Sequence, residues 1–407
     1  MRRVRLEISS RVRAVNGSFV STLTCSRCGA THDHTVAQNL CDCGGPLVVD
    51  YDLDAVRGSV TPDEIGGRAA SMWRYLELLP MKDPATVVTL GEGFTPLLPS
   101  QPLAERLGVR SAWVKDDGLN PTGTFKARGA ACGVSRAREL GISEVALPTA
   151  GNAGGAWACY GAAAGMKVHV AMPSDAPEAN RIECRAFGAE LTLVDGLISD
   201  AGRVTAEGVA EHGWFDCSTL KEPYRIEGKK TLGLEIAEQL GWEAPDAIVY
   251  PAGGGVGAIG IHRAFEQMRA LGWVDGPAPR VIVVQSSGCA PLVHAFEEGR
   301  SESEPWPDAE TIAAGLRVPK PLGDELVLRA IRETGGTAIA VDDREILEAM
   351  VWLATDTSIL ACPEGAATLA GAIACRERSD LGPGDRVVLI NTGTAAKYPE
   401  VLRAAFS

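Results

Sequence analysis

Residues 120–129 read NPTGTFKARG and place one lysine, Lys126, among small residues and hydroxyls where a strand gives way to a helix. A lysine that is to form a Schiff base with an aldehyde must be uncharged part of the time, and a partly desolvated position favours this. Phe125, the residue before it, can supply apolar surroundings. The residues alone leave open an ordinary surface lysine at the start of a helix.

A second turn, TAGNAG at residues 149–154, follows the apolar run VALP. It is typical of a tight strand–helix connection in which Asn152 caps the helix. The alternative is an anion-binding site, because the N–H groups at a helix N-terminus point toward a negatively charged ligand. Both interpretations place Asn152 at the carboxyl end of a strand.

A third turn, GGGVG at residues 253–257, follows the strand DAIVYPA. Without side chains, its backbone N–H groups can converge on a phosphate at the start of a helix. Gly255, Gly257 and Gly260 also form a G-x-G-x-x-G pattern, which favours a nicotinamide oxidoreductase as an alternative. The next strand, however, ends in Gln285, where a dinucleotide site requires an acidic residue. A phosphate cradle is therefore the better interpretation.

A fourth turn, residues 391–394 (NTGT), follows the apolar strand RVVLIN and carries Thr392, which can also be a simple cap of the strand end. From Glu144 onward, short apolar strands alternate with helices, which predicts an α/β protein with parallel-rich sheets. In such sheets the active site lies at the carboxyl ends of the strands, where these turns fall.

The sequence around Lys126 resembles the lysine motif of the fold-type II pyridoxal-phosphate enzymes, which include threonine synthase, amino-acid dehydratases and cysteine synthase. The resemblance implies a tryptophan synthase β-like fold with Lys126 as Schiff-base and proton-shuttling lysine, Asn152 at the phenolic oxygen and Thr392 at the pyridine nitrogen. A hydroxyl there leaves the ring a weaker electron sink, which suits elimination or replacement. The expected cofactor-binding residues are Lys126, Asn152, Gly253, Gly254, Gly255, Val256, Gly257 and Thr392.

Further segments are similar to threonine synthases in particular, among them TLGEGFTPLLPS and YRIEGKKTLGLEIAEQLGW. This implies conversion of O-phospho-L-homoserine and water to L-threonine and phosphate by a homodimer. Arg203 is a candidate for the phosphate, although its residue type and position also fit a solvated helix residue. The expected substrate-binding residues are Lys115, Thr149, Ala150, Gly151, Ala153 and Arg203.

The chain departs from the threonine synthase pattern at several positions. It reads FKARG in place of FKDRG, and TGTAAKY in place of TGHGLKD. Leu197 and Glu222 stand where Asn is expected, and a carboxylate at position 222 would repel a phosphate dianion. A related replacement enzyme or dehydratase acting on another, possibly O-phosphorylated, amino acid therefore stays open.

Cys25, Cys28, Cys41 and Cys43 form a CxxC and a CxC pair near the N-terminus, a set that suits a structural zinc ion. His32 and His34 lie between the pairs and can substitute as ligands, and ordinary reduced thiols are the alternative. We expect three parts: a Cys-rich module (1–50), a large cofactor domain (51–122 and 219–407) and a small α/β domain (123–218), with the cofactor between the two domains.

Composition narrows the remaining function classes. The net charge of -13 disfavours binding to nucleic acid or an anionic membrane, and the predicted partner is a small amino-acid substrate. Eleven cysteines, mostly single in apolar runs, fit a cytoplasmic protein. The basic start MRRVRLEISSRVR lacks the apolar stretch of a secretory signal, and no uninterrupted membrane span is expected. A non-catalytic binding protein on this fold would have no need of Lys126, Asn152 and Thr392.

Overall fold

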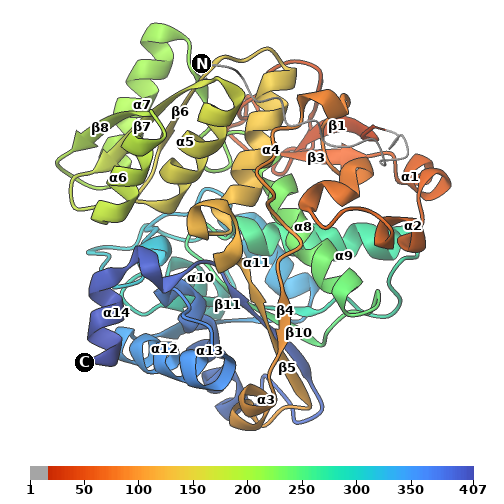
Figure 1. Cartoon of the computed structure of the whole chain (residues 1–407), viewed down its shortest axis with the longest axis vertical. Helices are drawn as coiled ribbons and strands as arrows, with labels where there is room; N and C mark the ends of the chain where they lie inside the picture. Colours follow the sequence, from red (N-terminus) through yellow and green to blue (C-terminus); the bar gives the residue numbers. More distant parts are fainter. Residues whose placement is uncertain (1–16) are drawn as a thin grey trace, which may run out of the picture.

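The computed structural model describes residues 17–407, so the expectations for the segment MRRVRLEISSRVR lie outside the described residues. The N-terminal module is a three-stranded antiparallel sheet, order β2-β1-β3, built from β1 (Val20–Cys25), β2 (Thr31–His32) and β3 (Leu47–Tyr51). Two short helices, α1 (Leu53–Ser59) and α2 (Pro62–Gly66), follow it (Figure 1). Its buried residues Leu23 and Val49 belong to the same hydrophobic core as residues of the later helices and strands, so the module is packed against the rest of the chain.

A six-stranded sheet forms the centre of the large part of the molecule (Figure 1). Five strands are parallel and the short edge strand β4 is antiparallel. The inner strands are continuous runs of Val and Ile, as a sheet that is covered on both faces requires. In spatial order the strands are β12 (Thr337–Val341), β11 (Arg280–Ser286), β10 (Ala247–Pro251), β13 (Arg386–Asn391), β5 (Ser111–Asp116) and β4 (Leu97–Pro99).

The two faces of this sheet bury alternate residues of each strand. Ile248 and Tyr250 pack on one face and Ala247 and Val249 on the other. The first face is covered by α8 (Tyr224–Gln239), α9 (Val256–Leu271), α10 (Pro291–Glu297) and α11 (Asp324–Glu333). The second is covered by α3 (Gln101–Leu107), α12 (Asp343–Thr357) and α13 (Pro363–Glu377), with α14 (Pro399–Phe406) against α12.

A second, four-stranded parallel sheet lies in the upper left of Figure 1. Its spatial order is β8 (Glu190–Val194), β7 (Lys167–Pro173), β6 (Glu144–Pro148) and β9 (Phe215–Asp216). Its helices are α4 (Lys126–Glu139), α5 (Asn152–Ala164), α6 (Glu178–Ala186) and α7 (Ile198–His212). Short 3₁₀ turns complete the fold: η1 (Met72–Leu78), η2 (Pro84–Thr86), η3 (Asp117–Leu119), η4 (Pro121–Gly123), η5 (Ala314–Leu316) and η6 (Ala395–Lys397).

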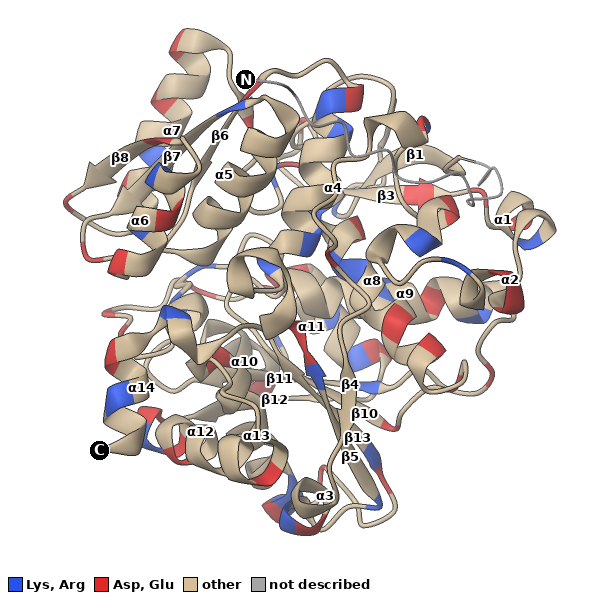
Figure 2. Cartoon of the chain, in the orientation of Figure 1, with Lys and Arg blue, Asp and Glu red and all other residues tan. Residues whose placement is uncertain are grey.

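The prediction of an α/β fold with two parallel-rich sheets is confirmed. The large sheet takes strands from both sides of the small one along the chain, and the expected domain boundaries themselves stay a prediction. Acidic and basic residues are spread over all parts of the fold (Figure 2). Within residues 17–407, no helix combines the length and the apolar character needed to cross a bilayer.

Helix α8 is unusual because it is buried on all sides although it carries charged residues of both signs. One of them, Glu227, accepts a hydrogen bond from the Tyr51 hydroxyl at 2.8 Å and forms an ion pair with Lys230. Tyr51 is the last residue of β3, so the N-terminal module supplies a hydrogen-bond donor to a buried carboxylate of this helix. Buried charges are stable only when they are paired and hydrogen-bonded, and α8 follows this rule at most positions.

Candidate active site

Lys126 is the first residue of α4, directly after a loop that is held against the Thr392 turn. The backbone N–H of Phe125 donates to the carbonyl oxygen of Thr392 at 2.9 Å, and Thr124 pairs with Gly393 as an isolated bridge. Gly123 takes φ +64°, which glycine adopts without the strain that a side chain would cause. The loop therefore fixes the lysine beside the carboxyl end of β13.

The amine of Lys126 is placed to be uncharged part of the time. Removal from bulk water lowers the pKa of Lys126 to about 8; Glu364 raises it and Arg225 lowers it further. The nitrogen lies 4.5 Å from the centroid of the Phe125 ring. Among residues 17–407, no hydrogen bond or ion pair engages this amine, which leaves it available for a covalent partner.

Asn152 begins α5, and its amide nitrogen donates to the Tyr398 hydroxyl at 2.7 Å. Tyr398 in turn donates to Glu364 Oε1 at 2.9 Å. Within the described part of the chain, Asn152 Oδ1 and Glu364 Oε2 are buried without a hydrogen-bond partner. Unsatisfied buried oxygens are costly, and in an enzyme they mark a place where a ligand donates or is oriented.

Thr149, Ala150, Gly151 and Ala153 surround Asn152 in the turn between β6 and α5, as expected from the sequence. The Thr149 hydroxyl receives a hydrogen bond from the Gly151 N–H at 3.0 Å, which tightens the turn. The helix that follows is thirteen residues long, so its N-terminus carries a partial positive charge. The position suits a carboxylate ligand, while the individual contacts stay a prediction.

Three of the four glycines at residues 253–257 cannot be replaced without collisions, whereas a Cβ atom on Gly254 would make only an ordinary contact with Thr219 at 3.5 Å. A Cβ atom on Gly253 would overlap the Gly315 carbonyl, one on Gly255 would overlap Val327, and one on Gly257 would overlap the Tyr250 hydroxyl. Gly255 also has φ +70° and is the N-cap of α9. A close-packed glycine turn at the start of a sixteen-residue helix fits a phosphate group.

Gln285 has a structural role that excludes it from ribose recognition. Its side-chain amide donates to the Ala252 carbonyl at 3.0 Å, and its oxygen accepts from the N–H groups of Leu292 and Val293. It thus caps α10 and ties β10 to β11. A nicotinamide site would need a free polar side chain at this strand end to bind the ribose, and Gln285 is fully engaged by the backbone.

Thr392 is buried at the end of β13, and its hydroxyl lies 3.5 Å from the Cys362 sulfur. The four turns are joined by direct contacts: Phe125 to Thr392, Asn152 through Tyr398 to Glu364, and Glu364 Oε1 to the Gly315 N–H at 2.7 Å. Gly315 packs on Gly253. The unpartnered oxygen of Asn152, the glycine cradle and the available amine of Lys126 together fit pyridoxal phosphate.

Lys115 was expected to bind the leaving phosphate, and the structure corrects this. The side chain is fully buried under the large sheet, where its amine pairs with Glu235 at 2.7 Å and donates to the Thr95 carbonyl and to Gln239. All three donors of the ammonium are therefore used internally. Burial opposes ionisation of Glu235, but Arg128 and Lys115 lower the pKa of Glu235 to about 2, so this is a structural ion-pair network.

Arg203 and Leu197 lie at the start of α7, away from the contacts that join the four turns. The Arg203 side chain is 64% exposed and pairs with Asp200 at 3.5 Å and with Glu207 at 3.6 Å. Leu197 is 56% exposed. The contacts of the structure do not connect Arg203 to Lys126, and its role in binding substrate stays a prediction.

Glu222 is not a free charge facing a substrate. It is fully buried, pairs with Arg225 at 2.9 Å and accepts from the backbone N–H groups of Tyr224 and Arg225 at the start of α8. Burial raises the pKa of Glu222 to about 7, although Arg225 lowers it in part. The expectation that this carboxylate would repel a phosphate dianion directly is therefore wrong, because Arg225 compensates it.

Four residues near Lys126 were missed by the sequence analysis: Glu364, Tyr398, Arg225 and Lys229. Tyr398 lies in the segment TGTAAKY, whose departure from the expected pattern was the available signal. The other three lie inside helices, where only the packing shows which side chains turn toward the site.

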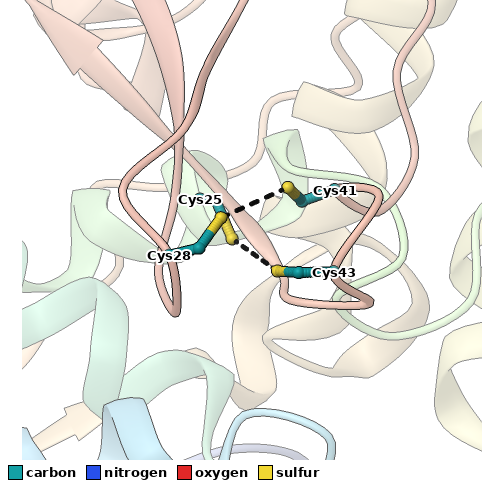
Figure 3. Close-up of side chains that lie close together, drawn as sticks. All are labelled: Cys25, Cys28, Cys41 and Cys43. Carbon is teal, nitrogen blue, oxygen red and sulfur yellow. Dashed lines mark hydrogen bonds between the residues drawn. The ribbon is translucent and has the colours of Figure 1, made fainter.

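The four cysteines of the N-terminal module come together from two turns (Figure 3). Cys25 Sγ lies 3.4 Å from Cys43 Sγ, and Cys28 Sγ lies 3.6 Å from Cys41 Sγ. All four sulfur atoms lie within 4.8 Å of one another. His32 and His34 are not members of this group. The ring of His34 instead contacts the guanidinium of Arg136, with 3.3 Å between Nδ1 and the arginine nitrogen.

Comparisons with known proteins identify the family of the chain. The model of the pyridoxal-phosphate dependent enzyme family matches residues 88–393. Threonine synthase of Methanocaldococcus jannaschii is 34% identical over 377 residues, 92% of this chain and 93% of the relative. Threonine synthase of Methanosarcina acetivorans is 35% identical over 383 residues, 93% of each chain.

Solved structures show the same fold at lower identity. Maize serine racemase superimposes with a TM-score of 0.67 at 23% identity, covering 77% of this chain and 91% of the racemase. Diaminopropionate ammonia lyase from Escherichia coli gives a TM-score of 0.68 at 20% identity, with 79% and 90% of the two chains covered. The chain therefore belongs to the pyridoxal-phosphate-dependent enzymes and, among them, to the threonine synthase family.

Proposed function

We propose that the protein converts O-phospho-L-homoserine and water to L-threonine and phosphate. The observation that carries this is the series of contacts that links the turn of Lys126 to the other three turns, in a chain that is similar to threonine synthases over more than nine-tenths of its length. The reaction breaks the bond between Cγ and the phosphate oxygen and forms a new C–O bond at Cβ.

Pyridoxal phosphate, when bound, supplies the electron sink that stabilises negative charge at Cα. We assign its phosphate to the turn at Gly253–Gly257, its phenolic oxygen to Asn152 and its pyridine nitrogen to Thr392. Because Thr392 is a neutral hydroxyl, it does not hold that nitrogen protonated, which favours elimination and replacement over transamination. Tyr398 and Glu364 support Asn152 through their hydrogen bonds.

We assign the acid–base role in this reaction to Lys126. A pKa of about 8 lets its amine take up and release protons near neutral pH, and the protons lost from Cα and Cβ would be balanced by one delivered to Cγ and one returned to Cα. The turn Thr149–Ala153 at the N-terminus of α5 would hold the substrate carboxylate. Arg203 would meet the phosphate if the small α/β part moves toward the large one on binding.

The test is to supply O-phospho-L-homoserine to the purified protein and to measure phosphate and threonine. Equal amounts of both products are expected, with none from Lys126→Ala. If neither product forms while the near-visible absorbance of the cofactor is intact, the substrate assignment is wrong and the family assignment is unaffected.

A second candidate is a related enzyme that acts on another, possibly O-phosphorylated, amino acid. Leu197 and Glu222 favour it, because neither residue offers the amide expected for a phosphate. Keto-acid release from L-threonine or L-serine, measured beside phosphate release, separates a dehydratase from a threonine synthase.

We also propose a structural zinc ion between Cys25, Cys28, Cys41 and Cys43. The four sulfurs lie close enough for tetrahedral coordination, which would leave no open position for catalysis. Metal analysis should give one zinc per chain, and Cys28→Ser with Cys43→Ser should abolish it while turnover persists at low temperature.

A homodimer in the cytoplasm is the assembly we propose from the family resemblance. All eleven cysteines are free thiols, which fits a reducing compartment. Light scattering during gel filtration, with an expected mass of twice 42.8 kDa, tests the assembly.

A further inference from the structure

The two oxygens of the Glu364 carboxylate differ in their surroundings. Glu364 is the second residue of α13, and only 5% of the residue is exposed. Its Oε1 atom accepts hydrogen bonds from the Tyr398 hydroxyl at 2.9 Å and from the Gly315 N–H at 2.7 Å. Its Oε2 atom is buried and has no hydrogen-bond partner within residues 17–407. The carboxylate is thus fixed through one oxygen, while the other is available to a ligand.

Two other buried carboxylate oxygens of the described chain lack a hydrogen bond, but each lies beside a cation. Glu227 Oε1 lies 3.8 Å from the Arg263 side chain. Asp380 Oδ2 lies 3.1 Å from Arg378. Over the described residues, Glu364 forms no ion pair. A buried carboxylate oxygen with neither a hydrogen bond nor a cation costs free energy, so packing alone does not account for Glu364.

Glu364 lies among the residues assigned to the reaction. The Tyr398 hydroxyl that donates to Glu364 accepts a hydrogen bond from Asn152 at 2.7 Å. Burial lowers the pKa of Lys126 to about 8, and among the charged groups Glu364 raises that pKa most strongly, so the two side chains are neighbours. Within residues 17–407, they form no direct ion pair. Polar groups that interact without direct contact leave room for a water molecule between them.

The proposed reaction needs a group that accepts a proton from water. Three protons are released: one from Cα, one from Cβ, and one from the water whose oxygen bonds to Cβ. One proton is delivered to Cγ, where the bond to the phosphate oxygen breaks, one returns to Cα, and the third leaves with the phosphate. The transfers at carbon are assigned to Lys126, which has a single amine. A carboxylate held nearby is a suitable base for the water.

We propose that Glu364 is a catalytic residue of this reaction: its Oε2 atom binds the water that adds at Cβ and accepts a proton from it as the new C–O bond forms. The hydrogen bonds from Gly315 and Tyr398 hold Oε1 and aim the second oxygen. The proton that Glu364 accepts is the one that leaves with the phosphate. This role deepens the proposed function and rests on it, because water has to add at Cβ only if the product is threonine.

Loss of this base should change the product more than the release of phosphate. Once phosphate has left, the unsaturated four-carbon group either takes up water at Cβ and gives L-threonine, or it is released and hydrolysed to 2-oxobutyrate and ammonia. Both courses consume one water for each phosphate. Removal of the base should slow the first course by about a hundredfold. Phosphate release precedes the addition of water and should continue.

The experiment compares wild-type holoenzyme with Glu364→Gln, which keeps the size of the side chain and an oxygen that can accept from Tyr398 and Gly315. Glu77→Gln is the matched control, because Glu77 is a buried carboxylate whose two oxygens are both held by Arg68 at 2.7 Å. Phosphate, L-threonine and 2-oxobutyrate formed from O-phospho-L-homoserine are measured for each protein. The pH is set above the pKa of Lys126, so that a change in this pKa does not alter the result.

The proposal predicts that Glu364→Gln releases phosphate but yields mainly 2-oxobutyrate, whereas the wild type and Glu77→Gln yield threonine. An unchanged ratio of threonine to 2-oxobutyrate in Glu364→Gln overturns it, as does an equal loss of all three products, which would indicate packing or an earlier step. Glu364→Ala replaces Glu364→Gln if that variant does not fold. If the wild type releases no phosphate, the proposed substrate is wrong and the role of Glu364 fails with it. If the wild type forms threonine and the ratio does not change, only the role of Glu364 fails.

Discussion

The cofactor side and the substrate side of the site are built in different ways. On the proposed cofactor side, Thr392 is buried, and a Cβ atom on Gly253, Gly255 or Gly257 would collide with its neighbours. On the side predicted to meet the substrate, Leu197 and Arg203 lie exposed at the N-cap and in the second turn of α7. If both assignments hold, the cofactor chemistry depends on backbone that cannot change, whereas the choice of substrate depends on exposed side chains that can be replaced at little cost in stability.

The largest effect on activity is expected from replacement of Lys126, the lysine proposed to bind the cofactor covalently. Lys126→Ala should lower kcat by about a thousandfold or more and remove the near-visible absorbance of the linked cofactor. Lys221→Ala, a lysine of similar charge outside the site, should leave both unchanged. Retention of turnover in Lys126→Ala would contradict the assignment of the cofactor side.

Gly255→Ala tests whether the cofactor side depends on its backbone. The residue has φ +70°, and its Cβ would overlap Val327, so we expect a loss of about 1–3 kcal/mol in stability and cofactor binding weaker by about tenfold. Gly241→Ala is the matched control, because its φ is +76° and its Cβ meets open space. It should lose about 1 kcal/mol of stability and bind cofactor normally, as fluorescence titration would show.

Arg203→Ala tests the substrate side alone. If Arg203 meets the substrate phosphate, KM for O-phospho-L-homoserine should rise about tenfold while the cofactor absorbance stays the same. Arg344→Ala removes an equally exposed arginine that also pairs four residues on, with Glu348, and should change neither quantity. Equal kinetics for the two variants would leave α7 without a part in substrate binding.

The sequence allowed the turns of the candidate site to be predicted, but not the charged side chains that helices bring to it. The glycine turn and the Thr392 turn could be predicted because local residue types determine a turn and its φ values. Lys115 could not, because its partner Glu235 lies 120 residues away on a helix whose packing no local pattern reveals. Lys229 and Glu364 were missed for the same reason: a charged residue inside a helix gives no signal of the direction in which it points.

The smallest expected effect concerns Glu222, which the family pattern places on the substrate side but which pairs with Arg225. Its pKa rises from about 4.3 when unfolded to about 7 when folded. The folded state therefore binds more protons between these values, and the free energy of unfolding should decrease as pH rises through that interval. Glu222→Gln should flatten this slope in urea unfolding curves measured from pH 5 to pH 8, and an unchanged slope would assign it to another group.

The hydrogen bond from Tyr51 to Glu227 ties the N-terminal module to helix α8, the buried helix that also carries Arg225. Glu227 also balances Lys230, the immediate neighbour of Lys229. A shortened chain that starts after β3 would leave the Glu227 carboxylate without the Tyr51 hydroxyl as donor and would expose one side of α8 to solvent. We therefore expect removal of the module to destabilise the protein, and a shortened version would first need a substitute for the Tyr51 hydroxyl.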